Sequence, residues 1–320
     1  MPKFSPLGAL GSIRGFLSVV REVDFDEVRG RAETAPSILL VTDDPGRGEQ
    51  AIQRLFGDDA IARVDLRTAD FGGVDRSRYD LVCVLDPEGY GVLTEVQRTL
   101  GDEASQKLVF LKSDNAGQTD AQVVESRDQL VALNSDLTPA LGRRFPELRL
   151  AAVKAIVDET AKANAQFSLI SNVPAVVPFI GGLVAASADL IVLTKNQVMM
   201  VYKIAAAHEK DLGDQMRIMR ELAPVVGSGF VWRTVAREAA SFLPLAAGTV
   251  PKVAIAYVGT VVLGRAADYY YRYGQKPTRE HLREFTNRAS ETASRLRISR
   301  QDEVSVDQAA LDRTDKSPGN

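Results

Sequence analysis

The sequence is poor in the residues that most often build metal and nucleophilic sites. Its 320 residues include one cysteine, Cys83, and two histidines, His208 and His281. One cysteine cannot form an internal disulfide, and so few Cys and His residues exclude a zinc site built from them. A Ser-His-Asp centre would depend on one of two isolated histidines. We therefore predict no metal ligands and no catalytic residues, and we expect Cys83 to pack in the core.

An excess of charge of one sign is also missing. The chain has 39 Lys and Arg residues against 42 Asp and Glu residues, which gives a net charge of −3. No overall field would attract nucleic acid, so we predict that nucleic acid is not a partner. The length is sufficient for two domains, and 45% hydrophobic residues is ordinary for a globular protein.

The first segment, residues 1–34, is predicted to be an amphipathic helix followed by a linker. It lacks the long apolar core of a secretory signal peptide. Apolar residues instead recur every three or four positions, at Phe4, Leu7, Leu10, Ile13, Leu17 and Val20. This spacing predicts one apolar helix face, which either packs on the body of the protein or lies in a membrane interface.

Residues 35–140 have the pattern of an α/β domain. Short apolar runs predict strands at Ile38–Val41, Ile61–Leu66, Leu81–Leu85, Leu108–Leu111 and Val123–Val124. Helical segments are predicted between them, at Glu49–Leu55 and Val92–Leu100. This alternation is typical of a parallel sheet covered on both faces, in which ligands bind at the carboxyl ends of the strands.

Three short motifs follow predicted strands in a meaningful order. A turn containing Gly46 and Gly48 follows the first strand, DFGG (Asp70 to Gly73) follows the second, and LKSD (Leu111 to Asp114) follows the fourth. This series resembles the P-loop, D-x-x-G and N-K-x-D motifs of GTP-binding domains. The resemblance implies a guanine-nucleotide site that includes Asp70, Gly73, Lys112 and Asp114. The alternative is that both aspartates are ordinary turn residues after strands.

The departures from the GTPase pattern concern the phosphate chemistry. A working loop reads G-x-x-x-x-G-K-[ST], in which the Lys reaches the phosphates and the hydroxyl holds Mg²⁺. Glu49 and Gln50 stand at those two positions, Asp43 stands at the first Gly, and Leu111 replaces the Asn of the last motif. We therefore predict a degenerate, non-catalytic domain with no cofactor other than guanine nucleotide at a vestigial site.

Residues 141–275 are predicted to be helical. Phe167–Ala188 contains no charged residue, and Ala239–Gly264 contains one, Lys252. Both stretches are long enough to cross a membrane, but each is interrupted by prolines and glycines, at Pro174, Pro178, Gly181, Gly182, Pro244, Gly248 and Pro251. Longer helices are predicted after the interruptions, at Leu183–Ala207 and Val253–Tyr273. Lys and Arg residues flank both ends of each apolar stretch. This favours hairpins with both ends on the cytoplasmic side, or a buried soluble core.

The remaining chain is polar. Pro277 and Thr278 predict the start of a helix that reaches about Leu296, so we assign a polar helix to residues 276–299. Residues 300–320 have few large apolar side chains, and we predict a disordered tail there.

The helical half resembles a known family. From Arg149 to Gly274, the broken apolar hairpins and the stretch TKNQVMMV (Thr194–Val201) are similar to the YcjF-type bacterial domain of unknown function. That family is often described as membrane-associated and occurs alone or after Era-like GTPase domains. The resemblance implies that residues 35–140 are the GTPase-like partner. The family has no established activity, so none is transferred.

These observations lead to one functional expectation and two alternatives. We expect a pseudo-GTPase that acts as a membrane-peripheral scaffold or regulator on the cytoplasmic side of the inner membrane. Its partners would be the membrane surface or inner-membrane proteins. The alternatives are an atypical GTP-binding protein and a soluble helical interaction protein in the cytoplasm.

Overall fold

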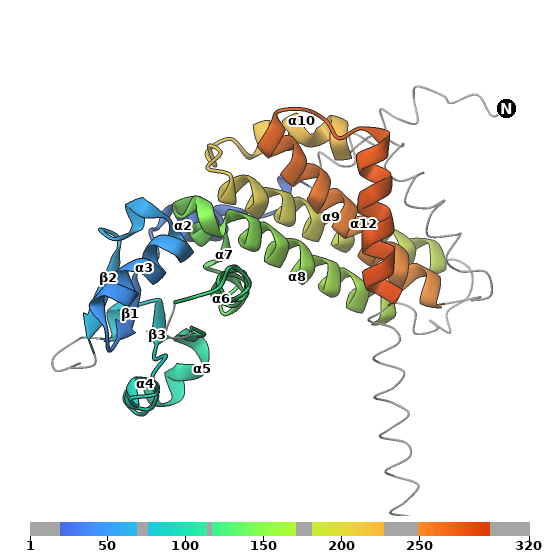
Figure 1. The fold of residues 1–320 in the computed structure, drawn as a ribbon. Coiled ribbons are helices and arrows are strands. Elements are labelled where there is room, and N and C mark those ends of the chain that lie inside the picture. The colour runs from blue at the N-terminus through green and yellow to red at the C-terminus, as the bar shows by residue number, and fades with distance from the viewer. Residues whose placement is uncertain (1–19, 69–75, 114–116, 171–180, 227–248, 295–320) are drawn as a thin grey trace, which may run out of the picture.

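The structure is a computed structural model that describes residues 20–68, 76–113, 117–170, 181–226 and 249–294. Within these ranges, a half built on a small parallel sheet is followed by a helical half (Figure 1). This confirms the predicted order of an α/β part and a helical part. The predicted tail at 300–320 and the apolar face of the N-terminal helix, apart from Val20, lie outside the described residues.

Four parallel strands form the sheet, in the order β2-β1-β3-β4. Their bounds are Ile38–Thr42 for β1, Val64–Thr68 for β2, Leu81–Leu85 for β3 and Leu108–Leu111 for β4. Every residue of β1 and β3 is buried. Central strands of a parallel sheet are covered on both faces, which explains why their sequences are continuous apolar runs. Four predicted strands are confirmed, although β2 begins three residues later than expected.

Helices cover both faces of the sheet, as predicted. On one face, α3 (Pro45–Phe56) and α6 (Asp120–Ala132) pack against Leu40 and Cys83. On the other face, α4 (Val92–Leu100) and α5 (Ala104–Lys107) pack against Val41. Cys83 is fully buried, and this burial raises the pKa of its thiol to about 12, so it is an inert core residue.

The fifth predicted strand, Val123–Val124, is wrong, because these residues belong to α6. The helix begins with a capping box in which the Thr119 hydroxyl accepts from the Gln122 amide and the Gln122 side chain accepts from the Thr119 amide. Val123 then faces the sheet, whereas Val124 is 58% exposed. The two valines therefore lie on the buried side and the exposed side of one helix, and they do not form a strand.

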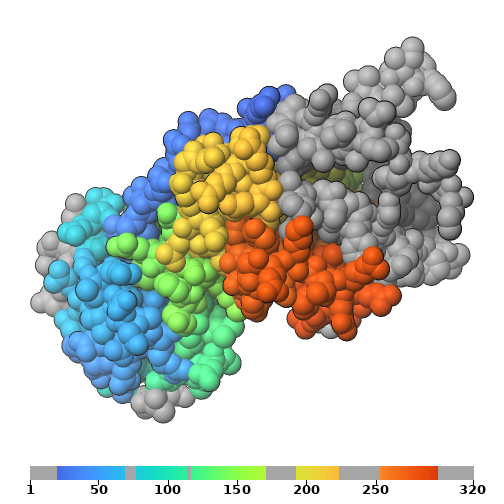
Figure 2. All heavy atoms as spheres, turned by 90° about the horizontal axis from the view of Figure 1, so that it is seen from above, coloured from blue at the N-terminus to red at the C-terminus, as the bar shows by residue number. Residues whose placement is uncertain are grey.

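The two halves share a helix. After α7 (Thr138–Arg144) and the short turn η4 (Pro146–Leu148), α8 runs from Arg149 to Ile170. Near its start, Ala151 and Ala152 pack in the core of the sheet half, whereas Val153, Ile156 and Val157 pack in the core of the helical half. The view in Figure 2 shows the sheet half, in blue and green, directly beside the helical half, in yellow to red.

The helical half is built around α8. It contains α2 (Asp26–Glu33), α9 (Gly181–Ala207), α10 (Gln215–Val226), α12 (Thr249–Tyr273) and a helix at 279–294. The two long helices predicted from the sequence are confirmed as α9 and α12, each starting a few residues early. Gly181 and Gly182 begin α9 rather than interrupting a helix. Pro251 also does not interrupt α12, because in the first turn its missing N–H would have no helical partner. The other predicted interruptions lie outside the described residues.

A buried polar layer connects three of these helices. Asn164 of α8 is fully buried and donates to the Thr260 hydroxyl of α12 at 2.9 Å. Its side-chain oxygen accepts from Asn196 of α9 at 2.8 Å. The layer fixes how α8, α9 and α12 align along their axes, because sliding any one of them would leave buried polar groups without partners.

None of the helices in the described ranges combines the length and the apolarity needed to cross a lipid bilayer.

Candidate functional site

The first candidate site is the carboxyl edge of the sheet. The strand order reverses between β1 and β3, and in parallel sheets ligands bind in the crevice at such a point. The residues that follow β1, β3 and β4 there are Asp43, Asp86 and Lys112. Any nucleotide bound as in a GTPase would place its phosphates at the connection between β1 and α3.

That connection is only two residues long. β1 ends at Thr42 and α3 begins at Pro45, so only Asp43 and Asp44 lie between them. Gly46 and Gly48 are in the first turn of α3, and the predicted glycine turn before the helix is therefore wrong. A phosphate-binding loop needs several residues outside the helix to wrap the phosphates, and this chain has no such loop here.

The start of α3 is already capped by a carboxylate. Oδ1 of Asp44 accepts from the backbone amides of Gly46 at 2.8 Å and Arg47 at 3.3 Å. These are the unpaired amides that make a helix start attractive to phosphate. A phosphate could use them only by displacing Asp44, and its charge would then lie close to the carboxylates of Asp43 and Asp44.

Gly48 has a packing role in this structure. A Cβ atom at this position would lie 2.6 Å from Cδ1 of Leu66 and 3.0 Å from Cγ2 of Thr42. The glycine therefore lets α3 approach β1 and β2 closely. Glu49 and Gln50, which stand where a GTPase has its Lys and Ser/Thr, are exposed residues of the same helix.

Side chains also accept from backbone amides near the start of the other two helices at this edge. The carboxylate of Asp86 accepts from the amides of Tyr90 at 2.9 Å and Leu93 at 3.3 Å, near the start of α4. Thr119 caps α6. At the described part of the edge, α3, α4 and α6 thus each begin with a side-chain acceptor from the chain itself.

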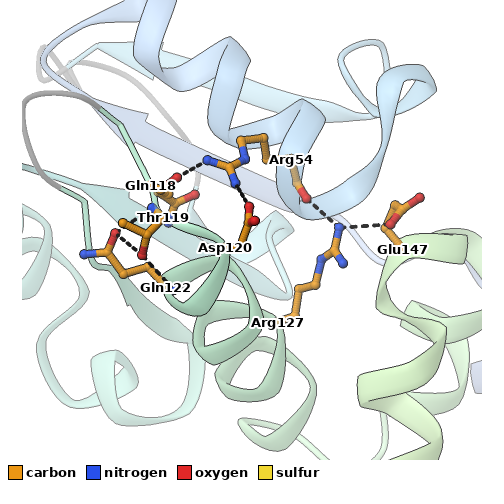
Figure 3. Close-up of polar contacts among 7 residues, drawn as sticks. All are labelled: Arg54, Gln118, Thr119, Asp120, Gln122, Arg127 and Glu147. Atoms are coloured by element: carbon orange, nitrogen blue, oxygen red, sulfur yellow. Dashed lines mark hydrogen bonds and ion pairs between the residues drawn. The ribbon is translucent and has the colours of Figure 1, made fainter.

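Two arginines link α3 with α6 and with the segment that contains Glu147 (Figure 3). Arg54 of α3 donates to the backbone oxygen of Gln118 and pairs with Asp120 at the start of α6, at 2.5 Å. Arg127 of α6 donates to the backbone oxygen of Arg54 at 2.6 Å and pairs with Glu147 at 3.0 Å. The cavity beside this network is about 60 Å³, far smaller than a site for a nucleotide.

Of the four predicted nucleotide-binding residues, the structure describes only Lys112. Its Nζ lies 2.7 Å from Oε1 of Glu125 on α6, in a pair whose side chains are both about half exposed. Asp70, Gly73 and Asp114 lie outside the described residues. The predicted guanine-nucleotide site therefore stays a prediction.

The second candidate site is a cleft that sequence reasoning missed. It measures about 440 Å³ and lies between α8, α12 and helix 279–294. Asp158 and Arg265 are among its lining residues, and Arg265 is an isolated charge between uncharged neighbours in the sequence. The isolated charge of Arg265 was the available signal, but only the fold brings it to one cleft with Asp158.

The Asp158 carboxyl group is perturbed by its surroundings. Burial raises its pKa, and the nearby cations Lys162, Lys154 and Arg265 oppose that rise. In the described part of the chain this carboxylate forms no ion pair. Perturbed carboxyl groups in clefts are typical of ligand sites, although structural networks perturb them too.

Neither candidate site offers an obvious metal centre. The described residues contain no group of three or more His, Cys, Asp or Glu side chains arranged to hold a metal ion.

Comparisons with family models, with curated proteins and with solved structures gave no match to this chain. Its function is therefore inferred from the residues and contacts above.

Proposed function

We propose that this chain is a non-catalytic scaffold or regulatory protein, in which a pseudo-GTPase half is joined to a YcjF-like helical half that contacts a membrane peripherally. The observation that carries the proposal is the two-residue connection between β1 and α3, which is closed by the Asp44 cap. We infer from this short connection that the sheet half does not contribute nucleotide hydrolysis to the function.

The physical argument concerns the phosphates. In working P-loop enzymes, backbone amides, a Lys and a hydroxyl-bound Mg²⁺ neutralise the charge of the triphosphate. Here the amides bond to Asp44, the Lys position holds Glu49, and no loop is available to wrap the phosphates. Each of these three features disfavours a bound triphosphate. The cation in the first turn of α3, Arg47, is paired with Asp44 at 3.6 Å and with Glu88 at 3.2 Å.

The membrane part of the proposal comes from one end of the helical half. We define the apolar tip as residues 163–170 of α8 and 181–188 of α9, a sequence range without any charged residue. It lies at the end of the helices away from the sheet (Figure 1). Leu169 and Ile170 at the end of α8 are 43% and 69% exposed.

The dimensions suit contact with a membrane surface. Eight helical residues extend about 12 Å along the helix axis, which is enough to reach the depth of about 5–10 Å at which interfacial helices bury their apolar faces. Exposed aliphatic side chains at the end of a charge-free segment favour such shallow insertion. The resemblance of this half to a membrane-associated family points in the same direction.

Nucleotide titration tests the first part of the proposal. Purified full-length protein with Mg²⁺ and a fluorescent GTP or GDP analogue is expected to show no saturable binding, which corresponds to a Kd weaker than about 1 mM. ATP analogues serve as the specificity control. Micromolar binding of GTP that is weakened by Asp114→Asn would contradict the proposal and favour an atypical GTP-binding protein.

A further inference from the structure

The floor of the cleft is formed where α8 and α12 pack closely together. α8 and α12 meet so closely behind it that a Cβ atom added at Gly264 would overlap the side chain of Val157. The chain then turns at Gly274, whose positive φ of 66° favours glycine, and returns as helix 279–294. Phe285 and Arg288 of that helix complete the cleft.

One wall of the cleft is aromatic. The Tyr269 ring lies 4.6 Å from the rings of Tyr273 and His281 and 6.4 Å from that of Phe285, measured between centroids. At the rim, Tyr273 is 60% exposed and Leu150 is 63% exposed. These side chains present apolar surface to any molecule that enters the cleft.

The cations that line the cleft differ in whether a carboxylate is paired with them. Four lining side chains are cationic and two are acidic. Three of the cations have carboxylate partners, in the pairs Arg272–Asp268 at 2.9 Å, Arg288–Glu284 at 2.5 Å and Lys154–Asp128 at 2.5 Å. Arg265 has no such partner among the described residues.

We propose that this cleft binds a small organic anion with an aromatic or aliphatic body, and that Arg265 holds its anionic group. Tyr269 and its aromatic neighbours contact the apolar body. The volume lies in the range of small-molecule sites, which are about 300–1,000 Å³. The site is independent of the proposed membrane contact, because its α8 residues are near the sheet end of that helix and the apolar tip is at the other end.

Asp158 sets the selectivity of this site. It lines the cleft with Arg265, and no ion pair joins it to another described residue. An anion bound at Arg265 is repelled by the ionised carboxylate, whereas a cationic or zwitterionic ligand is attracted by it. The substitution Asp158→Asn is therefore expected to raise the affinity for an anionic ligand and to lower the affinity for a cationic one.

Two probes with the same ring system test the proposal. 8-Anilinonaphthalene-1-sulfonate carries a sulfonate, whereas N-phenyl-1-naphthylamine has the same body without that charge. In fluorescence titrations of the full chain, we expect the sulfonate probe to bind more tightly. Arg265→Gln should weaken it about tenfold or more, the effect of losing a charge-assisted hydrogen bond, and leave the neutral probe unchanged.

Three further variants complete the test. Arg283→Gln, on helix 279–294 but outside the cleft lining, is expected to affect neither probe. Arg265→Lys keeps the charge and should retain most of the sulfonate affinity, which distinguishes loss of charge from misfolding. Asp158→Asn should tighten sulfonate binding. The proposal is overturned if Arg265→Gln and Arg283→Gln behave alike, if the neutral probe binds equally well, or if Asp158→Asn weakens the sulfonate probe.

Discussion

Asp44 determines what the start of α3 can bind. Its carboxylate bonds to the first amides of the helix, and Pro45 follows it at the first helical position. An Asp-Pro pair is a recognised helix-start signal, but the prediction of a glycine turn placed the start of this helix at Glu49, four residues too late. The role of Gly48 was not predictable from the sequence, because a glycine in a turn and a glycine under a close neighbour look alike until Leu66 is placed opposite it.

Asp158 leads to a prediction about pH. Burial raises the pKa of its carboxyl group, so the folded chain holds this proton more tightly than the unfolded chain does. Wild-type stability therefore falls as the pH rises through the raised pKa. Asp158→Asn removes the ionisation, and its stability relative to wild type is expected to increase from about pH 4 to pH 7.

Urea unfolding at several pH values measures this difference. Glu159→Gln, a change at an exposed neighbour on α8, is the control and should alter stability little at any of them. A difference between Asp158→Asn and wild type that is constant or decreasing with pH would contradict the assigned effect of burial.

Most helices and strands of the described ranges could be predicted, because their signals are local. The apolar runs of β1, β3 and β4 and the periodic segments of α4, α9 and α12 come directly from the sequence. The strand predicted at Val123 and Val124 was wrong because a two-residue apolar pair fits a strand and a helix equally well. The capping box at Thr119 is the signal that indicates a helix. The candidate nucleotide site was suggested by spacing alone, and spacing does not reveal which amides are already bonded.

Gly142 tests how closely the elements that join the two halves are packed. A Cβ atom there would lie 2.9 Å from the Cβ atoms of both Ala152 and Ala207, which cannot move without their backbones. We expect Gly142→Ala to lower the free energy of unfolding by about 1–3 kcal/mol, despite its better helix propensity.

Gly30→Ala is the matched control for that substitution. No atom lies within 4 Å of a Cβ at Gly30 in α2, so this change should stabilise the protein by up to about 1 kcal/mol. Urea midpoints compare the two variants with wild type. A Gly142→Ala protein as stable as wild type would show that α7, α8 and α9 are less tightly packed than described.

At the scale of the whole molecule, two features lie far apart. The carboxyl edge of the sheet, where side chains of the chain cap the helices, is at one end, and the apolar tip is at the far end of α8. The cleft lies between them and is built from residues more than 100 positions apart, such as Asp158 and Arg265. No local pattern could have joined these residues, because their proximity depends on how α8 and α12 pack. By contrast, the charge-free stretch that contributes the tip was evident in the sequence.

Vesicle flotation with and without Mg²⁺ and GTP tests the central claim, that the chain acts at a membrane surface through the apolar tip and independently of nucleotide. We expect the full chain to float with phosphatidylcholine–phosphatidylglycerol vesicles equally well in both conditions. Leu169→Glu combined with Ile170→Glu should remove binding, because two inserted aliphatic side chains contribute about 3–6 kcal/mol. Val124→Glu, at an exposed valine on α6, should not. A chain that stays at the bottom of the gradient, or floats only with GTP, would contradict the account.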